Sequence, residues 1–313
     1  DEWGAWLEGP QLATGRCFRV ERHQGRWWFV APSGRLFWSL GVTCVRAESA
    51  TPISDREFYF AELPPTHSPL AQFYGRGGWA PKGWYTNRSY RTFDFAAANL
   101  FRKYGEDWSN EWADHALDRL LSWGWTTIAN WSDIAVGQRR RMPYTYNASF
   151  TSPPIEGSTG YWGKFPDPFA PEFRTGIRRA MEKARRDGAV GDPWCLGFFV
   201  HNELSWGRSE ELGAAALRSS PTQPARTAAV ARLRLRHRDD LARLNSAWAT
   251  SFADWDQIVP PDRPTGAVTH DLEDLSAMIA DQYFRVIAEE VHRAAVLRSE
   301  ERRVGKECER LCR

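Results

Sequence analysis

The stretch WCLGFFVHNE, residues Trp194 to Glu203, decides the fold class predicted for this chain. Its first seven residues are apolar or small and show no alternation, which is typical of a parallel strand buried on both faces. The polar residues His201, Asn202 and Glu203 follow where this strand ends. In barrels of parallel strands the catalytic groups lie at the carboxyl ends of the strands, so Glu203 is a candidate general acid/base. The alternative is a Glu in the first turn of a helix, where it stabilises the positive end of the helix dipole.

The rest of the chain alternates between strand and helix patterns. We predict strands at 18–23, 26–30 and 36–42, a long aromatic loop at 47–92, a helix at 109–122, strands at 125–129 and 143–150, and helices at 171–187, 224–247 and 271–297. Ser109 and Asp271 are predicted N-caps, Pro171 occupies a favourable first helical position, and Gly124 ends its helix.

Helices followed by buried strands predict an α/β fold with a parallel sheet. Four such strand–helix units, each strand ending in polar residues, suggest the N-terminal half of a (β/α)8 TIM barrel. The first two strands form a β-hairpin segment that precedes it. We therefore divide the chain into an N-terminal β segment at 1–35, a half-barrel at 36–297 and a tail at 298–313.

Composition excludes several classes of partner. The net charge of +2 over 313 residues does not favour nucleic acid. No apolar run approaches the ~20 residues of a membrane helix, and no metal-binding spacing or cofactor motif is present. The 17 Trp residues are unusual, and several lie in Gly-rich loops. Such Trp residues suit the stacking of sugar rings, although large barrels also bury many Trp in their cores.

Several segments together resemble agarase-type glycoside hydrolases. They are GRWWFV at 25–30, Gly34 with FWSLGV at 37–42, SWGWTTI at 122–128, NWSD at 130–133, and LNSAW at 244–248. The family is part of a large retaining clan whose barrels carry Asn-Glu at the end of the fourth strand. The resemblance spans roughly residues 15–297.

The resemblance implies roles for particular residues. Glu203 matches the general acid/base, and Asn202 matches the residue that binds the sugar 2-hydroxyl. The expected substrate contacts are Trp131, Asp133, His201, Trp206 and Arg46, although relatives often have an Asp where His201 stands. The implied function is hydrolysis of β-glycosidic bonds in a polysaccharide, agarose or another galactan, outside the cell or in the periplasm. The alternatives are a β-galactosidase or mannanase of the same clan, or a carbohydrate-binding barrel without catalysis.

The chemistry of a retaining glycosidase requires a second carboxylate about 5–5.5 Å from the first. In this clan that nucleophile ends barrel strand seven, and we find only four barrel strands. The segment RSEERRVGKEC at 298–308 resembles a translated sequencing adapter, so we expect residues from about Arg298 onward to be non-native. We therefore expect a fragment that is inactive by itself.

Overall fold

The computed structural model describes residues 1–80 and 82–296, and the tail predicted from Arg298 lies outside them. The chain packs into two compact units. The first comprises Asp1–Asn147 and Gly191–Phe198, and the second comprises Ala148–Val190 and the described residues from Phe199 onward. The boundaries predicted at residues 35 and 297 stay predictions.

The first unit begins with the predicted hairpin. Strands β1 (Arg19–His23) and β2 (Arg26–Val30) are antiparallel, and β3 (Leu36–Phe37) adds to β2. Gln24 and Gly25 both have positive φ, 48° and 80°, as the tight turn of a two-residue hairpin requires.

The single strand predicted at 36–42 is wrong, because it is two strands in two sheets. β3 closes the antiparallel sheet, and β4 (Gly41–Val42) begins a parallel one. Between them, the Leu40 amide donates to the Thr126 hydroxyl (2.8 Å) and Ser39 Oγ bonds Thr127 Oγ1 (2.8 Å). These side-chain bonds replace ladder bonds and interrupt the strand.

The predicted parallel sheet is present. Its order is β10-β9-β8-β4, with β8 at Thr127–Ile128, β9 at Tyr144–Asn147 and β10 at Cys195–Phe199. β4 pairs with β8, and β8 with β9, in parallel. The Tyr144 amide donates to Trp194 O (2.9 Å) and the Ala148 amide to Phe199 O (2.8 Å), so β9 and β10 advance in the same direction.

The expectation that β10 is buried on both faces is wrong. Its residues are half-buried, and Phe199 is 44% exposed. The reason is its place at one end of the sheet order, where the described residues give it a single neighbouring strand.

The long loop predicted at 47–92 is also wrong. It folds into a three-stranded antiparallel sheet of order β5-β7-β6, formed by Ala50–Pro52, Tyr90–Asp94 and Tyr74–Gly77, with 3-10 helices at Glu57–Tyr59 and Pro69–Phe73. Ile53, Phe93 and Ala98 form its buried core. These strands are short and pair with residues distant in the sequence, so no local periodicity predicts them.

Three α-helices complete the described part of the first unit. They are α1 (Phe95–Tyr104), α2 (Trp108–Ser122) and α3 (Ile134–Gly137), with a 3-10 turn at Gly105–Asp107 between the first two. Ser109 is not the N-cap of α2, because this turn leads directly into the helix at Trp108. Gly124, at φ 80°, follows the end of α2 as predicted.

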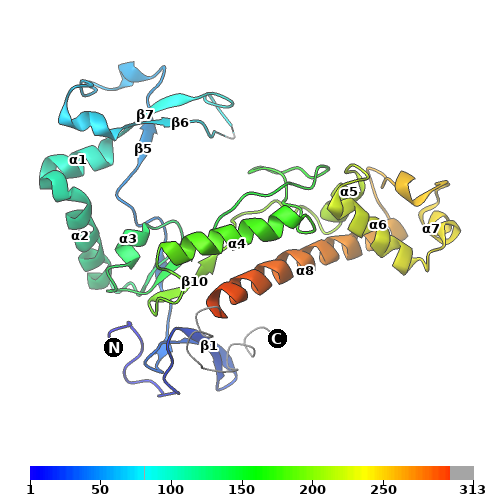
Figure 1. Ribbon diagram of the computed structural model, residues 1–313, viewed down its shortest axis with the longest axis horizontal. Coiled ribbons are helices and arrows are strands. Elements are labelled where there is room, and N and C mark those ends of the chain that lie inside the picture. Colours follow the sequence, from blue (N-terminus) through cyan, green and yellow to red (C-terminus); the bar gives the residue numbers. More distant parts are fainter. Residues whose placement is uncertain (81, 297–313) are drawn as a thin grey trace. The chain divides into compact units, whose positions relative to one another are not determined.

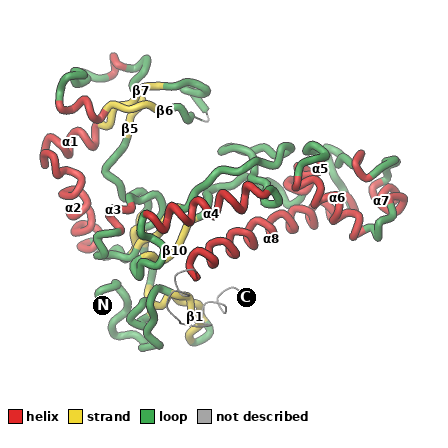
Figure 2. The backbone as a smooth tube through the Cα atoms, viewed as in Figure 1, coloured by secondary structure: helices red, strands yellow, loops and turns green. Residues whose placement is uncertain are grey.

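Apart from the last residue of β10, the regular elements described in the second unit are helices (Figure 2). They are α4 (Pro171–Arg186), α5 (Glu211–Leu217), α6 (Pro224–Arg236), α7 (Leu241–Trp248), a 3-10 turn at Trp255–Gln257, and α8 (Ala267–Val296). Pro171 stands at the start of α4, as predicted. No described helix combines the length and the apolar character that a bilayer crossing needs.

Helices α4 and α8 lie side by side (Figure 1). Gln282 binds Pro168 O, Arg174 and Arg178 bind the buried Glu290, and Arg185 binds Ala294 O. Because these contacts advance along both helices in the same sense, α4 and α8 run parallel.

The single helix predicted at 224–247 is wrong because Asp240 starts a new helix, its side chain accepting from the amides of Ala242 (3.0 Å) and Arg243 (3.2 Å). Asp271 is not an N-cap either. Helix α8 begins four residues earlier, and Asp271 is a buried carboxylate within it, bonded to Arg236, His237 and Trp248.

Candidate active site

The segment that follows β10 turns through two left-handed residues. His201 has φ 60° and Glu203 has φ 48°, with the exposed Asn202 between them. Side chains with a Cβ rarely adopt this region, at a cost of about 1–3 kcal/mol each. Such a turn persists only where surrounding contacts hold it.

His201 is held from both sides of its ring. Nε2 lies 3.1 Å from Phe150 O, which only accepts, so Nε2 carries the proton. Nδ1 therefore accepts from the Tyr283 hydroxyl at 2.9 Å. Burial lowers the pKa of His201, which favours this neutral form, and burial raises the pKa of Tyr283, which keeps it a donor. Both ring nitrogens are thus occupied by protein partners.

Glu203 is exposed, and its carboxylate has one protein donor among the described contacts. Nε1 of Trp162 donates to Glu203 Oε2 at 2.7 Å. Trp162 is 47% exposed and packs edge to face on Tyr161, with ring centroids 4.4 Å apart. The arrangement presents a carboxyl group that is held at one oxygen and open to solvent.

Trp206 belongs to an aromatic cluster beneath this turn. Its ring stacks on Phe284, with centroids 5.7 Å apart and planes at 11°, and meets Phe165 edge to face at 4.7 Å. Tyr283, the partner of His201, lies 5.7 Å from the same ring. Trp206 is therefore half-buried by packing as well as a predicted substrate contact.

The other predicted site residues, Arg46, Trp131 and Asp133, belong to the first unit. Trp131 has φ 60° and is 42% exposed, and Arg46 is exposed. The Asp133 amide donates to Val45 O (2.9 Å), and the Asp133 side chain caps α3 by accepting from Ala135 N (2.9 Å). The predicted role of these three residues as substrate contacts stays a prediction.

Sequence reasoning assigned no role to three polar residues that the structure shows in hydrogen bonds at or after strand ends. Tyr283 of α8 fixes His201 from 82 residues away. Asn130 and Asn147 follow or end β8 and β9, and Asn147 Nδ2 donates to the buried Asn130 Oδ1 at 3.0 Å. The signal available for the asparagines was the one used for Glu203, a polar residue where an apolar strand stops.

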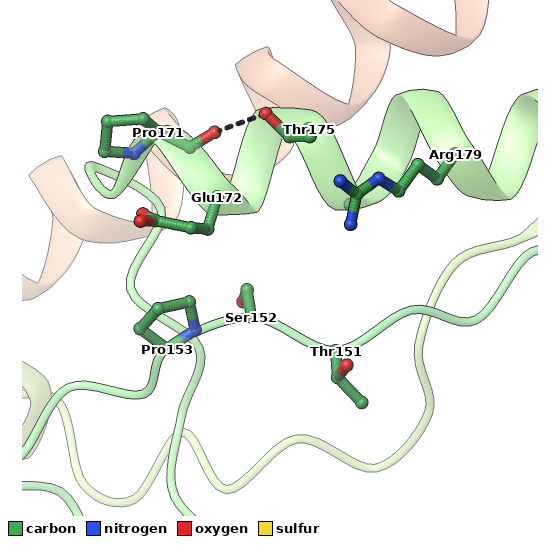
Figure 3. Close-up of a pocket in the computed structure, with 8 residues that line it drawn as sticks. Thr151, Ser152, Pro153, Pro171, Glu172, Thr175 and Arg179 are labelled. Carbon is green, nitrogen blue, oxygen red and sulfur yellow. Dashed lines mark hydrogen bonds between the residues drawn. The ribbon is translucent and has the colours of Figure 1, made fainter.

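A pocket of about 490 Å³ lies elsewhere in the second unit, between the first turns of α4 and the segment 151–153 (Figure 3). Glu172, Thr175 and Arg179 line it on the helix side. None of the seven predicted site residues lines it. In the described part of the chain, no three His, Cys, Asp or Glu side chains gather as a metal site would require.

Comparison with known proteins confirms the predicted resemblance to agarase-type glycoside hydrolases. No protein-family model matches the chain. Beta-agarase B of Vibrio sp. strain JT0107 is 29% identical over 92% of this chain, and beta-agarase A of the same strain is 26% identical over 88%. Solved structures of an exo-beta-agarase and of another agarase each share 26% identity over 94% of the chain, with TM-scores of 0.83 and 0.81.

The relatives are much longer than this chain. The match covers 34% and 30% of the two Vibrio proteins, and 47% and 46% of the two solved chains. The chain thus spans about a third of the curated relatives and about half of the solved structures.

Proposed function

We propose that this chain supplies the first half of a (β/α)8 barrel in a retaining glycoside hydrolase that cleaves β-glycosidic bonds of agarose or another galactan. The observation that carries the proposal is the exposed Glu203, on the turn after the last strand of a four-stranded parallel sheet. The parallel course of α4, which precedes β10, and α8, which follows it after α5, α6 and α7, supports the barrel, because successive βα units place their packed helices in this way.

In the proposed mechanism, Glu203 protonates the leaving glycosidic oxygen and then activates water. Its exposure suits both steps, because substrate and water must each reach the same carboxyl. Asn202, beside it on the turn, binds the sugar 2-hydroxyl. The nucleophile is a second carboxylate about 5–5.5 Å away, contributed by a part of the whole protein that this chain does not include.

Trp131, with its exposed ring, is the proposed sugar-stacking residue, and Arg46, Asp133 and Trp206 are further proposed contacts. Both ring nitrogens of His201 are engaged, so we assign His201 to holding the turn rather than to binding sugar. A polysaccharide substrate favours action outside the cell or in the periplasm.

The test uses the full-length protein and two substrates, an agaro-oligosaccharide and an activated aryl glycoside. Glu203→Gln is expected to lower kcat on the oligosaccharide by about 10²–10⁴-fold, because proton donation is lost. The effect on formation of the glycosyl-enzyme from the aryl glycoside is smaller, since that leaving group departs without a proton. The control is Glu211→Gln, a nearby exposed carboxylate that pairs with Arg208.

Equal losses on both substrates would assign Glu203 a role other than acid catalysis. A full-length protein that binds agaro-oligosaccharides without cleaving either substrate would be the carbohydrate-binding barrel instead.

A further inference from the structure

We infer that Trp162 is a positioning residue for Glu203: its indole N–H holds Oε2, so that Oε1 carries the proton transferred in the reaction. The inference rests on the proposed acid/base role of Glu203. It links the turn after β10 to a residue of the loop between β9 and α4.

The chemistry of the contact suits this role. An indole N–H is only a donor, so Trp162 cannot take the proton from Glu203. A carboxylate accepts at either oxygen, and a protonated carboxyl still accepts at its carbonyl oxygen. The 2.7 Å bond to Oε2 is therefore compatible with both protonation states, and the proton of the acid form lies on Oε1. The carboxyl keeps one orientation while it alternates between acid and base.

Glu203 needs such an anchor because little else restrains it. Its side chain is exposed, and an exposed glutamate samples several rotamers. The backbone of the turn is fixed from the other side by the bonds of His201 to Tyr283 and Phe150. Trp162 supplies the matching restraint at the carboxyl end of the side chain.

The loop that carries Trp162 is built to hold one shape. Gly163 has φ 129°, which side chains with a Cβ rarely adopt. A Cβ on Gly160 would lie 2.4 Å from Gly163 O and 2.1 Å from Ser205 Oγ, so this loop closes tightly on itself and on the chain after Glu203. Tyr161 and Trp162 stand between the two glycines, and the Tyr161 ring packs edge to face against the indole of Trp162.

The test is Trp162→Phe in the full-length protein, which keeps an aromatic ring and removes the N–H. Loss of one hydrogen bond to a charged group predicts a fall in kcat on agaro-oligosaccharides of about ten- to a hundredfold, with KM changed by less than about twofold. The activated aryl glycoside is expected to lose less. Trp84→Phe is the matched control, because Trp84 is an exposed Trp whose indole N–H also meets a carboxylate, Asp55, at 3.4 Å.

Glu203→Gln separates this inference from the proposed function. If Glu203→Gln retains full activity, the proposed acid/base role fails. If Glu203→Gln is inactive while Trp162→Phe matches the wild type, the positioning role is overturned, and so it is if Trp162→Phe raises KM alone. Gly163→Ala is a second variant that displaces the loop without altering the indole. It is expected to reproduce the loss in kcat, and wild-type kcat in a folded Gly163→Ala protein would contradict the inference.

Discussion

Replacing Asp271 by Asn isolates the network that joins α6, α7 and α8. The Asp271 side chain is 5% exposed. Its Oδ2 accepts from His237 Nε2 and from Trp248 Nε1, both at 2.7 Å, and its Oδ1 accepts from Arg236. An amide of the same shape keeps one acceptor and turns an NH₂ group toward a donor. The variant therefore loses charge-assisted bonds and leaves buried polar groups facing one another.

The expected loss of unfolding free energy is about 3–4 kcal/mol, the scale for breaking a buried ion pair from one side. Asp274→Asn is the matched control. Asp274 lies one turn along α8, bonds Arg232 at 2.7 Å and 2.8 Å and pairs with Arg236 at 3.7 Å, but its side chain is 20% exposed and both arginines more so. Removal of that pair is expected to cost about 0.2–1 kcal/mol.

Urea unfolding, followed by far-UV circular dichroism for the helices, gives both free energies. Hydrogen exchange of α7 and α8 tells whether the loss is local to these helices. Equal destabilisation by the two variants, or a change below about 1 kcal/mol for Asp271→Asn, would refute the reasoning that burial decides the strength of these pairs.

Three further outcomes are expected. Burial lowers the pKa of His201. As the pH falls below about 6.5, His201 therefore binds a proton in the unfolded chain but stays neutral in the folded one, so the free energy of unfolding decreases. His201→Gln should flatten this pH dependence in urea titrations between about pH 7 and 5. Glu290→Gln should lower the thermal midpoint by loosening α4 from α8, measured by calorimetry, and an unchanged midpoint would contradict the role of this buried carboxylate. Gly137→Ala places a Cβ 2.6 Å from the Tyr144 ring and should cost about 1–3 kcal/mol, whereas Gly78→Ala, with nothing within 4 Å, should cost less than half of that.

The sequence predicts an element where its evidence lies within the element itself. Strand β2 is predicted with its observed bounds because a turn precedes it and an apolar run fills it. Pro171 predicts the start of α4, and Gly124 predicts the end of α2. Asp271 shows the limit of local evidence. An acidic residue before an apolar helix is typical of an N-cap, and only partners from α6 and α7 reveal it as a buried charge.

The candidate site also contains residues that local sequence predicts and residues that only long-range contacts reveal. Glu203 is found from the sequence because the switch from apolar to polar residues at the end of β10 is local. Trp162 stands 41 residues from Glu203, and Tyr283 stands 82 residues from His201, so no spacing along the chain links either pair. Each pair forms only when the loop after β9 and helix α8 have packed.

The segment Leu244–Trp248 shows that residues carrying a family resemblance do not all carry its chemistry. Asn245 Oδ1 accepts from the Phe252 amide (2.9 Å) and from the Thr250 hydroxyl (2.9 Å), which organises the turn after α7. Trp248 donates to the buried Asp271. Both side chains form hydrogen bonds within the second unit, so this part of the resemblance is explained by a shared fold. Asn202 and Glu203 are exposed on a strained turn, where packing supplies no reason for either residue type. We propose that function accounts for their identity, and we expect substitution of either residue to change turnover of the full-length protein more than stability.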